Sequence, residues 1–430
     1  MKMKMKSALF CEIARYNTSR NFIKATYMKK IVLLFGTNII PNFEPHIHEV
    51  DSSLCVIECD YASHKSIEYP NQHLALIKGR EFKEIKKLLK GSKLVAVINR
   101  RDYFEKLHGK IVDYYNIPGP SSAAIDQISN KANFHKLMLD LNLDMFRPRT
   151  ISCHLSEVPR LLKSLQFPVI IKPFAGAHSR GVYKLDNAAD FKDIQPKLYA
   201  HFQKELAVNI LSNNEQTVLI EEYLPGKMVV PICYVDKKHK VHFISLVKAV
   251  AARDLNLDHY QLIYRTTPTN VKESIQQKMR FILQKISKAT LLKETFLDPE
   301  FFVKDKNVYL IEVNVRMGGF RYHLAKAAFD IDLNKMIAEI ALNREVDDQI
   351  NTVYSATACE IWSSRSGKVK SIKLPRSKKI IWQRINMNPG DRYLSPPQGD
   401  KSLGSYYVKS KENSLRIAKK IRNKMVIEFE

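Results

Sequence analysis

Three polar side chains alternate with apolar ones in a single predicted strand. In the segment 308–319, VYLIEVNVRMGG, the polar residues are Glu312, Asn314 and Arg316. Because successive side chains of a strand point to opposite faces, these three share one face and the apolar residues the other. Polar groups buried without partners cost on the order of a few kcal/mol. A divalent metal with a polyphosphate would supply partners, since carboxylate and amide oxygens bind hard cations and arginine binds phosphoryl oxygens. A surface-exposed amphipathic strand is the alternative, which the apolar flanking sequence disfavours.

A second carboxylate, Glu300, precedes Glu312 by 12 positions, with a KDKN turn at 304–307 between them. This spacing fits an antiparallel hairpin that places the two carboxylates side by side. Mg²⁺ is commonly held by one or two protein carboxylates together with substrate phosphates. The predicted metal ligands are therefore Glu300, Glu312 and Asn314, with Mg²⁺ or Mn²⁺ as the ion.

A lysine stands near the end of the apolar strand predicted at 167–174, and a loop of small residues follows it at 176–182. Lys172 can reach phosphate oxygens, and backbone N–H groups of the loop can fold over them. The loop is not a P-loop, because GxxxxGK[ST] requires a lysine where Val182 stands. Taken alone, such a loop is more often a surface hairpin.

The strand predicted at 217–224 ends in acidic residues and a Pro-Gly turn. Backbone groups at such a strand end can pair with an adenine edge, and a carboxylate there can bind a ribose hydroxyl. An acidic strand end without a ligand is the alternative.

The elements that carry these residues divide the chain into several predicted domains. Residues 28–126 alternate short β-rich runs with polar segments, which is typical of a small parallel α/β sheet. The turn IPGPSS at 117–122 ends this pattern, and Ser121 or Ser122 can cap the helix that follows. The strands predicted in this domain are 31–35, 53–59, 73–77 and 93–98.

Residues 127–343 have longer strands in mainly antiparallel sheets, with helices expected at 130–141, 272–290 and 322–342. Residues 344–430 return to short strands and end with an amphipathic helix, 413–425, and a last strand. The predicted fold class is α/β and α+β. We expect an N-terminal extension at 1–27 followed by the domains 28–126, 127–343 and 344–430.

The overall composition is that of a globular protein with a strongly basic balance. The 430 residues carry a formal net charge of +25, which attracts anionic partners of several kinds. The basic residues are scattered, however, and no Arg-rich stripe or aromatic-basic module is present. We therefore expect a solvated basic surface, without a nucleic-acid partner.

The cysteines and the hydropathy pattern indicate the cellular compartment in which the protein is expected. Six cysteines without a CxxC pair indicate neither a disulfide framework nor a zinc site, so a cytoplasmic location is predicted. No apolar run approaches the roughly 20 residues that cross a bilayer, and no membrane partner is expected.

Taken in order, the lysine strand, the glycine loop, EEYLPG, Glu300 and EVNVRMGG resemble the ATP-grasp superfamily over about residues 28–430. The resemblance implies an α/β domain ahead of a two-lobed ATP-grasp domain and a small C-terminal domain like that of carboxylases and amino-acid ligases. The amino-acid ligase and dipeptide synthetase branch is the most similar, because RMGG leads into Tyr322-His323-Leu324 and a helix.

The resemblance also implies roles for individual residues. Lys131, although preceded by Asn130 where the family usually has Asp, matches the first ATP lysine, and Lys172 matches the lysine on the α- and β-phosphates. Glu300, Glu312 and Asn314 match the metal ligands, and Arg316 matches the arginine beside the transferred phosphoryl group. The matching loop residues that close over the triphosphate are Gly176, Ser179, Gly181 and Val182, and the matching hinge residues are Glu221, Glu222, Tyr223 and Leu224. The family usually has Glu where Met228 stands, so a ribose or substrate contact is expected to differ.

The function that follows is a Mg·ATP-dependent ligase that activates a carboxylate as an acyl phosphate and joins it to an amine. Lys172 and Arg316 are the expected catalytic residues. Amino acids are the expected substrates. The sequence leaves open whether the protein forms a homodimer. A basic nucleic-acid-binding or nucleic-acid-modifying protein and an ATP-grasp kinase are the alternatives; the protein-kinase signature is absent, because no DFG occurs.

Overall fold

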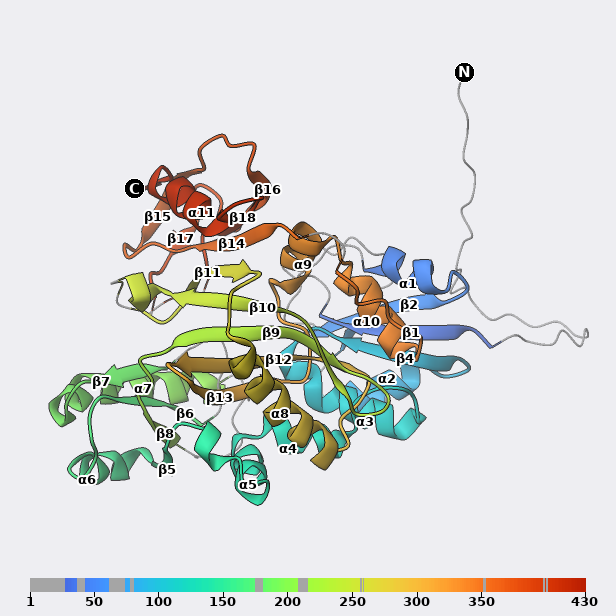
Figure 1. Cartoon of the computed structure of the whole chain (residues 1–430), viewed down its shortest axis with the longest axis horizontal. Coiled ribbons are helices and arrows are strands. Elements are labelled where there is room, and N and C mark those ends of the chain that lie inside the picture. Colours follow the sequence, from blue (N-terminus) through green and yellow to red (C-terminus); the bar gives the residue numbers. More distant parts are fainter. Residues whose placement is uncertain are drawn as a thin grey trace, which may run out of the picture.

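The structure is a computed structural model of the chain. It describes residues 28–36, 43–61, 74–77, 81–174, 181–207, 216–255, 257, 259–350, 353–396, 399 and 401–430. Within this part of the chain the strands form four sheets. Figure 1 shows a large sheet through the middle of the molecule, with the N-terminal sheet at its right and a small sheet at its lower left.

The N-terminal sheet is parallel, as the sequence predicts, and its strand order is β3-β2-β1-β4. Its central strand β1, KIVLLF, is buried from Ile31 to Phe35, because helices and other strands cover both of its faces. The strands are β1 (Lys30–Phe35), β2 (Cys55–Tyr61), β3 (Leu74–Ile77) and β4 (Lys93–Asn99). The helices that accompany them are α1 (Glu44–Val50), α2 (Glu81–Leu88) and α3 (Glu105–Tyr115).

The order of these strands changes direction at β1. The chain passes outward from β1 to β2 and β3, and then crosses to β4 on the other side of β1. In open parallel sheets, ligands bind beside the carboxyl ends of the two strands at such a reversal. The residues at that place are Gly36 after β1 and Arg100 after β4.

The large sheet has eight antiparallel strands in the order β13-β12-β9-β10-β11-β14-β18-β16. Helix α8 (Glu273–Ala289) and the helices α4 (Ser122–Ser129) and α5 (Lys131–Asp140) pack on one face of it. On the other face, α9 (Arg321–Phe329) and α10 (Leu333–Ala341) pack between this sheet and the N-terminal sheet. Its strands are β9 (Lys227–Val235), β10 (Val241–Ala251), β11 (Leu262–Thr267), β12 (Thr295–Lys304), β13 (Asn307–Asn314), β14 (Ser355–Ile361), β16 (Ile380–Ile385) and β18 (Gly404–Ser410).

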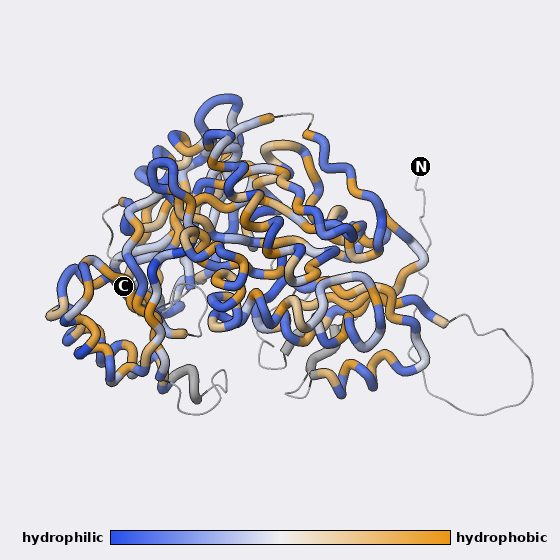
Figure 2. The backbone as a smooth tube through the Cα atoms, turned by 60° about the horizontal axis from the view of Figure 1, so that its bottom comes forward, coloured by the Kyte–Doolittle hydropathy of each residue, from blue (hydrophilic) through white to orange (hydrophobic). Residues whose placement is uncertain are grey.

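The small sheet, with the order β5-β8-β6-β7, has its own core with helices α6 (Val158–Leu162) and α7 (Phe191–Ala207). Its strands are β5 (Thr150–His154), β6 (Val169–Pro173), β7 (Tyr183–Leu185) and β8 (Thr217–Glu222). Near the C-terminus β15 (Gly367–Lys373) pairs with β17 (Arg392–Tyr393) and β19 (Val426–Phe429), and α11 (Ser414–Asn423) packs on β14 and β18. Figure 2 shows hydrophobic and hydrophilic residues alternating along these elements, as expected where one face of each lies in a core.

The single helix predicted at 322–342 is wrong, because two helices occupy this segment. Helix α9 ends at Asp330, which has a left-handed conformation with φ of 60°. The side chain of Asp332 then accepts hydrogen bonds from the backbone N–H groups of Asn334 and Lys335 and caps α10. Aspartate tolerates the left-handed region and is a strong N-cap, so two aspartates in FDID end one helix and begin another.

The predicted cap at Ser121 is confirmed, and the structure adds a cap at Asn130. Ser121 caps α4 by accepting from Ala124 N at 3.1 Å, and Asn130 caps α5 by accepting from Ala132 N at 3.0 Å. The predicted domain boundaries stay predictions; after residue 344, β14, β18 and β16 continue the large sheet. In the part of the chain that the structure describes, no helix combines the length and the apolar character that a membrane span requires.

Candidate active site

The hairpin β12–β13 places four oxygen-bearing side chains on one face. Glu300 lies opposite Glu312, and Asp298 lies opposite Asn314. Directly opposed residues on one face of an antiparallel pair have Cβ atoms about 5 Å apart. The hairpin predicted from the spacing of the two glutamates is therefore present, and it adds Asp298 to the predicted set.

The two glutamates are electrostatically coupled. Burial raises the pKa of Glu300, and the neighbouring carboxylates of Glu312 and Asp298 raise it further, whereas Arg321 and Lys172 act in the opposite direction. A bound cation would relieve this repulsion, so the residues present fit a divalent metal. Within the described ranges no group of three or more His, Cys, Asp or Glu side chains forms a metal site. Asn314 and substrate oxygens would have to complete the coordination of an ion on Glu300 and Glu312.

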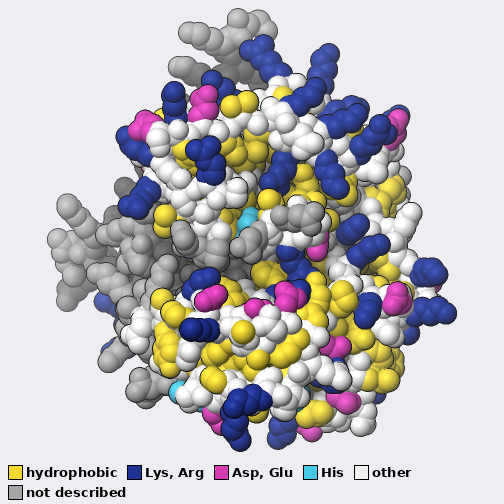
Figure 3. Space-filling view, turned by 90° about the vertical axis from the view of Figure 1, so that its left-hand side faces the viewer, with side chains coloured by type: hydrophobic (Ala, Val, Ile, Leu, Met, Phe, Trp, Pro, Cys, Tyr) yellow, Lys and Arg dark blue, Asp and Glu magenta, His cyan; other side chains and the backbone are white. Residues whose placement is uncertain are grey.

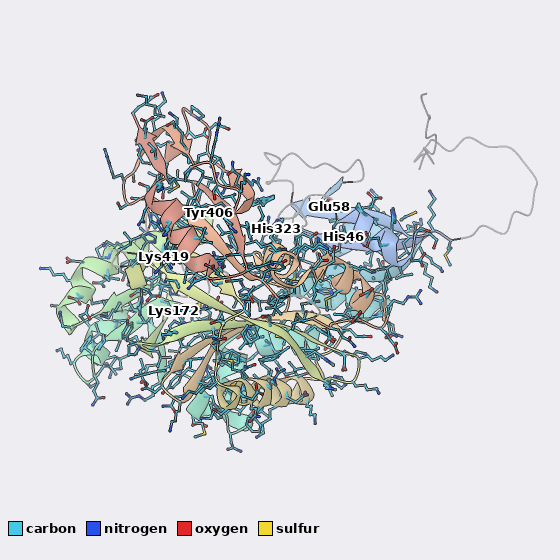
Figure 4. The ribbon with its side chains drawn as sticks, turned by 45° about the horizontal axis from the view of Figure 1, so that its top comes forward. His46, Glu58, Lys172, His323, Tyr406 and Lys419 are labelled. Carbon is cyan, nitrogen blue, oxygen red and sulfur yellow. The ribbon has the colours of Figure 1, made fainter. Side chains whose placement is uncertain are left out.

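Lys172 projects from β6 and forms an ion pair with Glu221 of the adjacent strand β8, with 2.7 Å between Nζ and Oε2. Only 12% of the Lys172 side chain and 6% of the Glu221 side chain are exposed, so solvent screens this pair little. Figure 4 labels Lys172 in the small-sheet region of the molecule.

Lys131 connects this pair to the hairpin. It is the first residue of α5, directly after the cap Asn130. Burial lowers its pKa, Lys172 lowers it further, and Glu312 and Glu221 act in the opposite direction. These interactions show that the structure gathers Lys131, Lys172, Glu221, Glu300 and Glu312 between the small and the large sheets.

The predicted hinge residues lie at and after the end of β8. The side chain of Glu222 forms an exposed ion pair with Arg149, 3.0 Å from Nε to Oε2. The Tyr223 ring is contacted by Lys184 and by Arg253, whose charged groups lie 4.9 and 4.5 Å from its centre. Leu224 is buried. Met228 lies in β9, opposite Ala249 and Phe302, so no carboxylate occupies that place.

The glycine loop is only partly described. Gly181 has a φ of +71°, and a Cβ there would lie 2.8 Å from Pro173 Cγ, so this position requires glycine. Val182 directly precedes β7. Gly176 and Ser179 lie outside the described residues, and the role of the loop in phosphate binding stays a prediction.

The guanidinium donors of Arg316 are engaged by carboxylates and do not point freely toward Lys131 and Lys172. Its guanidinium binds Asp102 of the N-terminal domain closely through Nε and Nη2, and Nη1 lies 3.4 Å from Asp298 Oδ2. Burial would lower the pKa of Arg316, but Asp102 and Asp298 outweigh burial and raise it. Asp298 also accepts from Arg321, at 3.1 Å. Arg316 thus joins the strand end after β13 to the N-terminal domain.

Glu105, at the start of α3, strengthens the same junction. Its Oε1 accepts a hydrogen bond from the backbone N of Val315 at 3.0 Å, and its Oε2 accepts one from the Ser129 hydroxyl. Burial raises the pKa of Glu105 to about 7, although both hydrogen bonds and Arg316 oppose the rise.

Sequence reasoning missed four residues of this region: Asp102, Glu105, Asp298 and Arg321. Asp298 had a usable signal, because it lies two positions before Glu300 and shares its face. Asp102 and Glu105 had none, since more than 200 residues separate them from Arg316 and Val315.

Fold and site together define a protein in which lysines and carboxylates gather between a small antiparallel sheet and a large one. Residues 165–323 match the family model described as "ATP-grasp domain". Over this segment the chain is therefore similar to the ATP-grasp family, as its motifs predict.

The chain is also similar to individual proteins. The chain is 22% identical over 298 residues to an uncharacterized protein, y4rH, of Sinorhizobium fredii, covering 67% of this chain and 57% of that protein. It is 25% identical to the D-alanine–D-alanine ligase of Petrotoga mobilis, covering 37% of this chain and 49% of that enzyme. The chain thus spans about half the length of these two curated relatives. Among solved structures, L-amino acid ligase from Bacillus licheniformis has a TM-score of 0.75 at 15% identity, over 96% of this chain and 100% of that one. This likeness shows the fold.

The close contact at Gly318 generates a test of the ion pairs around Asp298. A Cβ at Gly318 would lie 2.5 Å from Asp298 Oδ1, whereas a Cβ at Gly319 would meet nothing within 4 Å. Because Arg316 and Arg321 hold the Asp298 carboxylate, Gly318→Ala is expected to lower the free energy of unfolding by about 1–3 kcal/mol. Gly319→Ala is the matched control and should change it by less than about 0.5 kcal/mol. Denaturant unfolding of the two variants measures this, and equal stabilities would contradict the contact.

Glu105 generates a prediction about pH. Its pKa, about 7 in the folded protein, exceeds the roughly 4.3 of an unperturbed glutamate. The folded state therefore favours the protonated carboxyl. The resulting stabilisation is complete below the unfolded value and is lost as pH rises through the folded one. Gln resembles the protonated acid and does not titrate.

We therefore expect Glu105→Gln to lose less stability than the parent protein between pH 4.5 and pH 8, by up to roughly 3 kcal/mol. Urea unfolding across this range, on both proteins, gives the comparison. Parallel pH profiles would show that Glu105 does not titrate in this way.

Proposed function

We propose that this protein is an ATP- and Mg²⁺-dependent ligase that activates a carboxylate as an acyl phosphate, joins it to an amine, and releases ADP and phosphate. The observation that carries the proposal is the cross-strand pair Glu300–Glu312, coupled to Lys131 and Lys172. The paired carboxylates suit a magnesium ion, and the paired lysines beside them suit the phosphate oxygens of a triphosphate.

The two lysines hold the phosphates in this proposal. Lys131 and Lys172 repel each other, and burial adds to the cost of the Lys131 charge. Phosphate oxygens between the two ammonium groups would remove this repulsion. The hinge from Glu221 to Leu224 would hold the adenine and ribose, and the loop that contains Gly181 and Val182 would cover the phosphates and exclude water from the acyl phosphate.

Glu300, Glu312 and Asn314 would hold Mg²⁺, or Mn²⁺ in its place. When bound, the ion supplies positive charge next to the phosphoryl group that is transferred, which is where charge stabilisation contributes most in such reactions. Bridging the two glutamates would also remove the repulsion that raises the pKa of Glu300.

Arg316 supplies a further positive charge near the transferred group. Its donors are engaged by Asp102, by Asp298 and by the carbonyl oxygen of Met317. A phosphoryl group that binds Arg316 directly would therefore have to replace one of these partners. A phosphate that binds Lys172 would likewise have to replace Glu221, which forms an ion pair with this lysine.

Amino acids are the proposed substrates, because two of the similar proteins are named D-alanine–D-alanine ligase and L-amino acid ligase. A reducing, cytoplasmic setting is proposed from the five described cysteines, all of which carry free thiols. Figure 3 shows Lys and Arg scattered over one face with Asp and Glu between them, a pattern that does not favour a nucleic-acid-binding stripe on that face.

Glu312→Gln tests the proposal. The amide removes the charge that would hold the metal and keeps the size of the side chain, so turnover should fall on the order of 10²- to 10³-fold, the loss seen when one electrostatic stabiliser is removed. ADP and phosphate release would be measured on pairs of amino acids, with mass spectrometry of the products.

Glu428→Gln is the control, because Glu428 lies in β19 and hydrogen-bonds the Ser371 hydroxyl far along the chain from this cluster. Both variants should unfold at the temperature of the parent protein within a few degrees. Full ADP release by a folded Glu312→Gln protein would refute the site. A stable phosphorylated product without coupling would identify a kinase instead.

A further inference from the structure

Arg100 is a buried arginine whose guanidinium has no hydrogen-bond partner in the described part of the chain. Only 3% of the residue is exposed, and Nε, Nη1 and Nη2 are all without a partner. A buried charge without a partner is strongly destabilising. Such a group is therefore expected to have a partner outside the described residues, and a bound anion would be one.

The backbone fixes Arg100 at the reversal point of the N-terminal sheet. Its N donates to Phe35 O at 3.0 Å, which joins the carboxyl ends of β4 and β1. Side chains alternate along a strand, so Arg100 shares the face of Ile98, which packs in one core with Met317 and Leu324. Arg100 therefore faces the segment that follows β13.

The charges around Arg100 also indicate a missing anion. Its pKa is lowered to about 9, first by burial and then by the charges of Arg316 and Arg101, whereas Asp298 acts to raise it. Asp298 already binds Arg316 and Arg321. The carboxylate of Asp298 is thus used by other arginines, and within the described ranges the Arg100 charge has no partner.

The geometry of the neighbours indicates where the anion belongs. Asp298 is opposite Asn314 in the hairpin, and Arg316 follows Asn314 by two residues. An anion on Arg100 would therefore lie beside the hairpin end that carries the proposed metal ligands. The nucleotide hinge is on another sheet, at the end of β8.

We propose that Arg100 binds an oxyanion of the substrate to be ligated, a carboxylate or a phosphate, and so selects anionic substrates. The planar guanidinium offers two parallel donors to either group. The identity of the substrate class rests on the proposed ligase function, whereas the oxyanion site itself does not depend on catalysis.

Arg100→Met tests the oxyanion site without any turnover. Methionine keeps much of the volume and removes the unpaired charge, so the variant should melt at a higher temperature than the parent protein in ligand-free buffer. Sodium phosphate and sodium acetate are the probes for the two kinds of oxyanion. At equal ionic strength, at least one of them should raise the melting temperature of the parent protein and not that of Arg100→Met.

Arg422→Met is the matched control, because Arg422 lies in α11 and its Nη1 also lacks a partner among the described residues. It should keep the full response to the oxyanion. The same shift in all three proteins would overturn the proposal, as would a ligand-free Arg100→Met protein that melts lower and still responds to the probes.

Substrate selection is tested with pairs of amine substrates that differ in one oxyanion: L-amino acids against the matching amino-acid amides, and O-phospho-L-serine against L-serine for the phosphate arm. The parent protein should show a KM at least ~30-fold lower for the anionic member of a pair, the loss typical when one partner of a buried charge pair is removed. Arg100→Met should abolish this preference, and Arg422→Met should retain it. A preference that survives in Arg100→Met overturns the role in selection. Absence of ADP release from the parent protein with every substrate would refute the ligase function and leave the oxyanion test to decide the role of Arg100.

Discussion

Glu300 and Glu312 lie opposite each other on one hairpin, and the repulsion between their carboxylates is the interaction that the surrounding charged groups must balance. Their repulsion, together with burial, raises the pKa of Glu300. The hairpin fixes the pair through backbone hydrogen bonds, so the side chains cannot separate without breaking the sheet. Positive charge from other elements is the remaining compensation, and Lys172 and Arg321 supply part of it. Protonation of Glu300, which its raised pKa favours, or a further cation would relieve the remaining repulsion.

The residues of this region come from elements at three separate sheets, which explains why the site depends on the whole fold. Lys172 belongs to the small sheet, the glutamates to the large sheet, and Asp102 and Glu105 to the segment after β4 of the N-terminal sheet. Asp102 binds Arg316, and Glu105 accepts from the backbone of Val315. The N-terminal domain therefore fixes the end of the strand that carries the proposed metal ligands, and it positions the site as well as bordering it.

The sequence predicted the parts of the site that local periodicity encodes. Alternation along 308–316 and the spacing from Glu300 to Glu312 were sufficient for the hairpin and for its polar face. The parallel N-terminal sheet was predictable because strands buried on both faces are almost wholly apolar. The break between α9 and α10 was missed because both helices are apolar at helical spacing, and only the aspartates at 330 and 332 separate them. Asp102, the partner of Arg316 from the segment after β4, could not be predicted, since more than 200 residues separate the two.

The contrast between Arg316 and Arg100 shows what motif reasoning alone does not supply. Arg316 lies in the motif, and carboxylates from two domains already occupy its donors. Arg100 lies in no motif, and its donors are all free within the described chain. Both guanidinium groups are buried beside Asp298, which has only two oxygens and uses them on Arg316 and Arg321. An incoming oxyanion would therefore find Arg100 available at once, whereas Arg316 would first have to release Asp102 or Asp298. In the proposed reaction Arg100 would therefore bind the substrate in the ground state, and Arg316 would be the arginine whose partners change as charge develops during phosphoryl transfer.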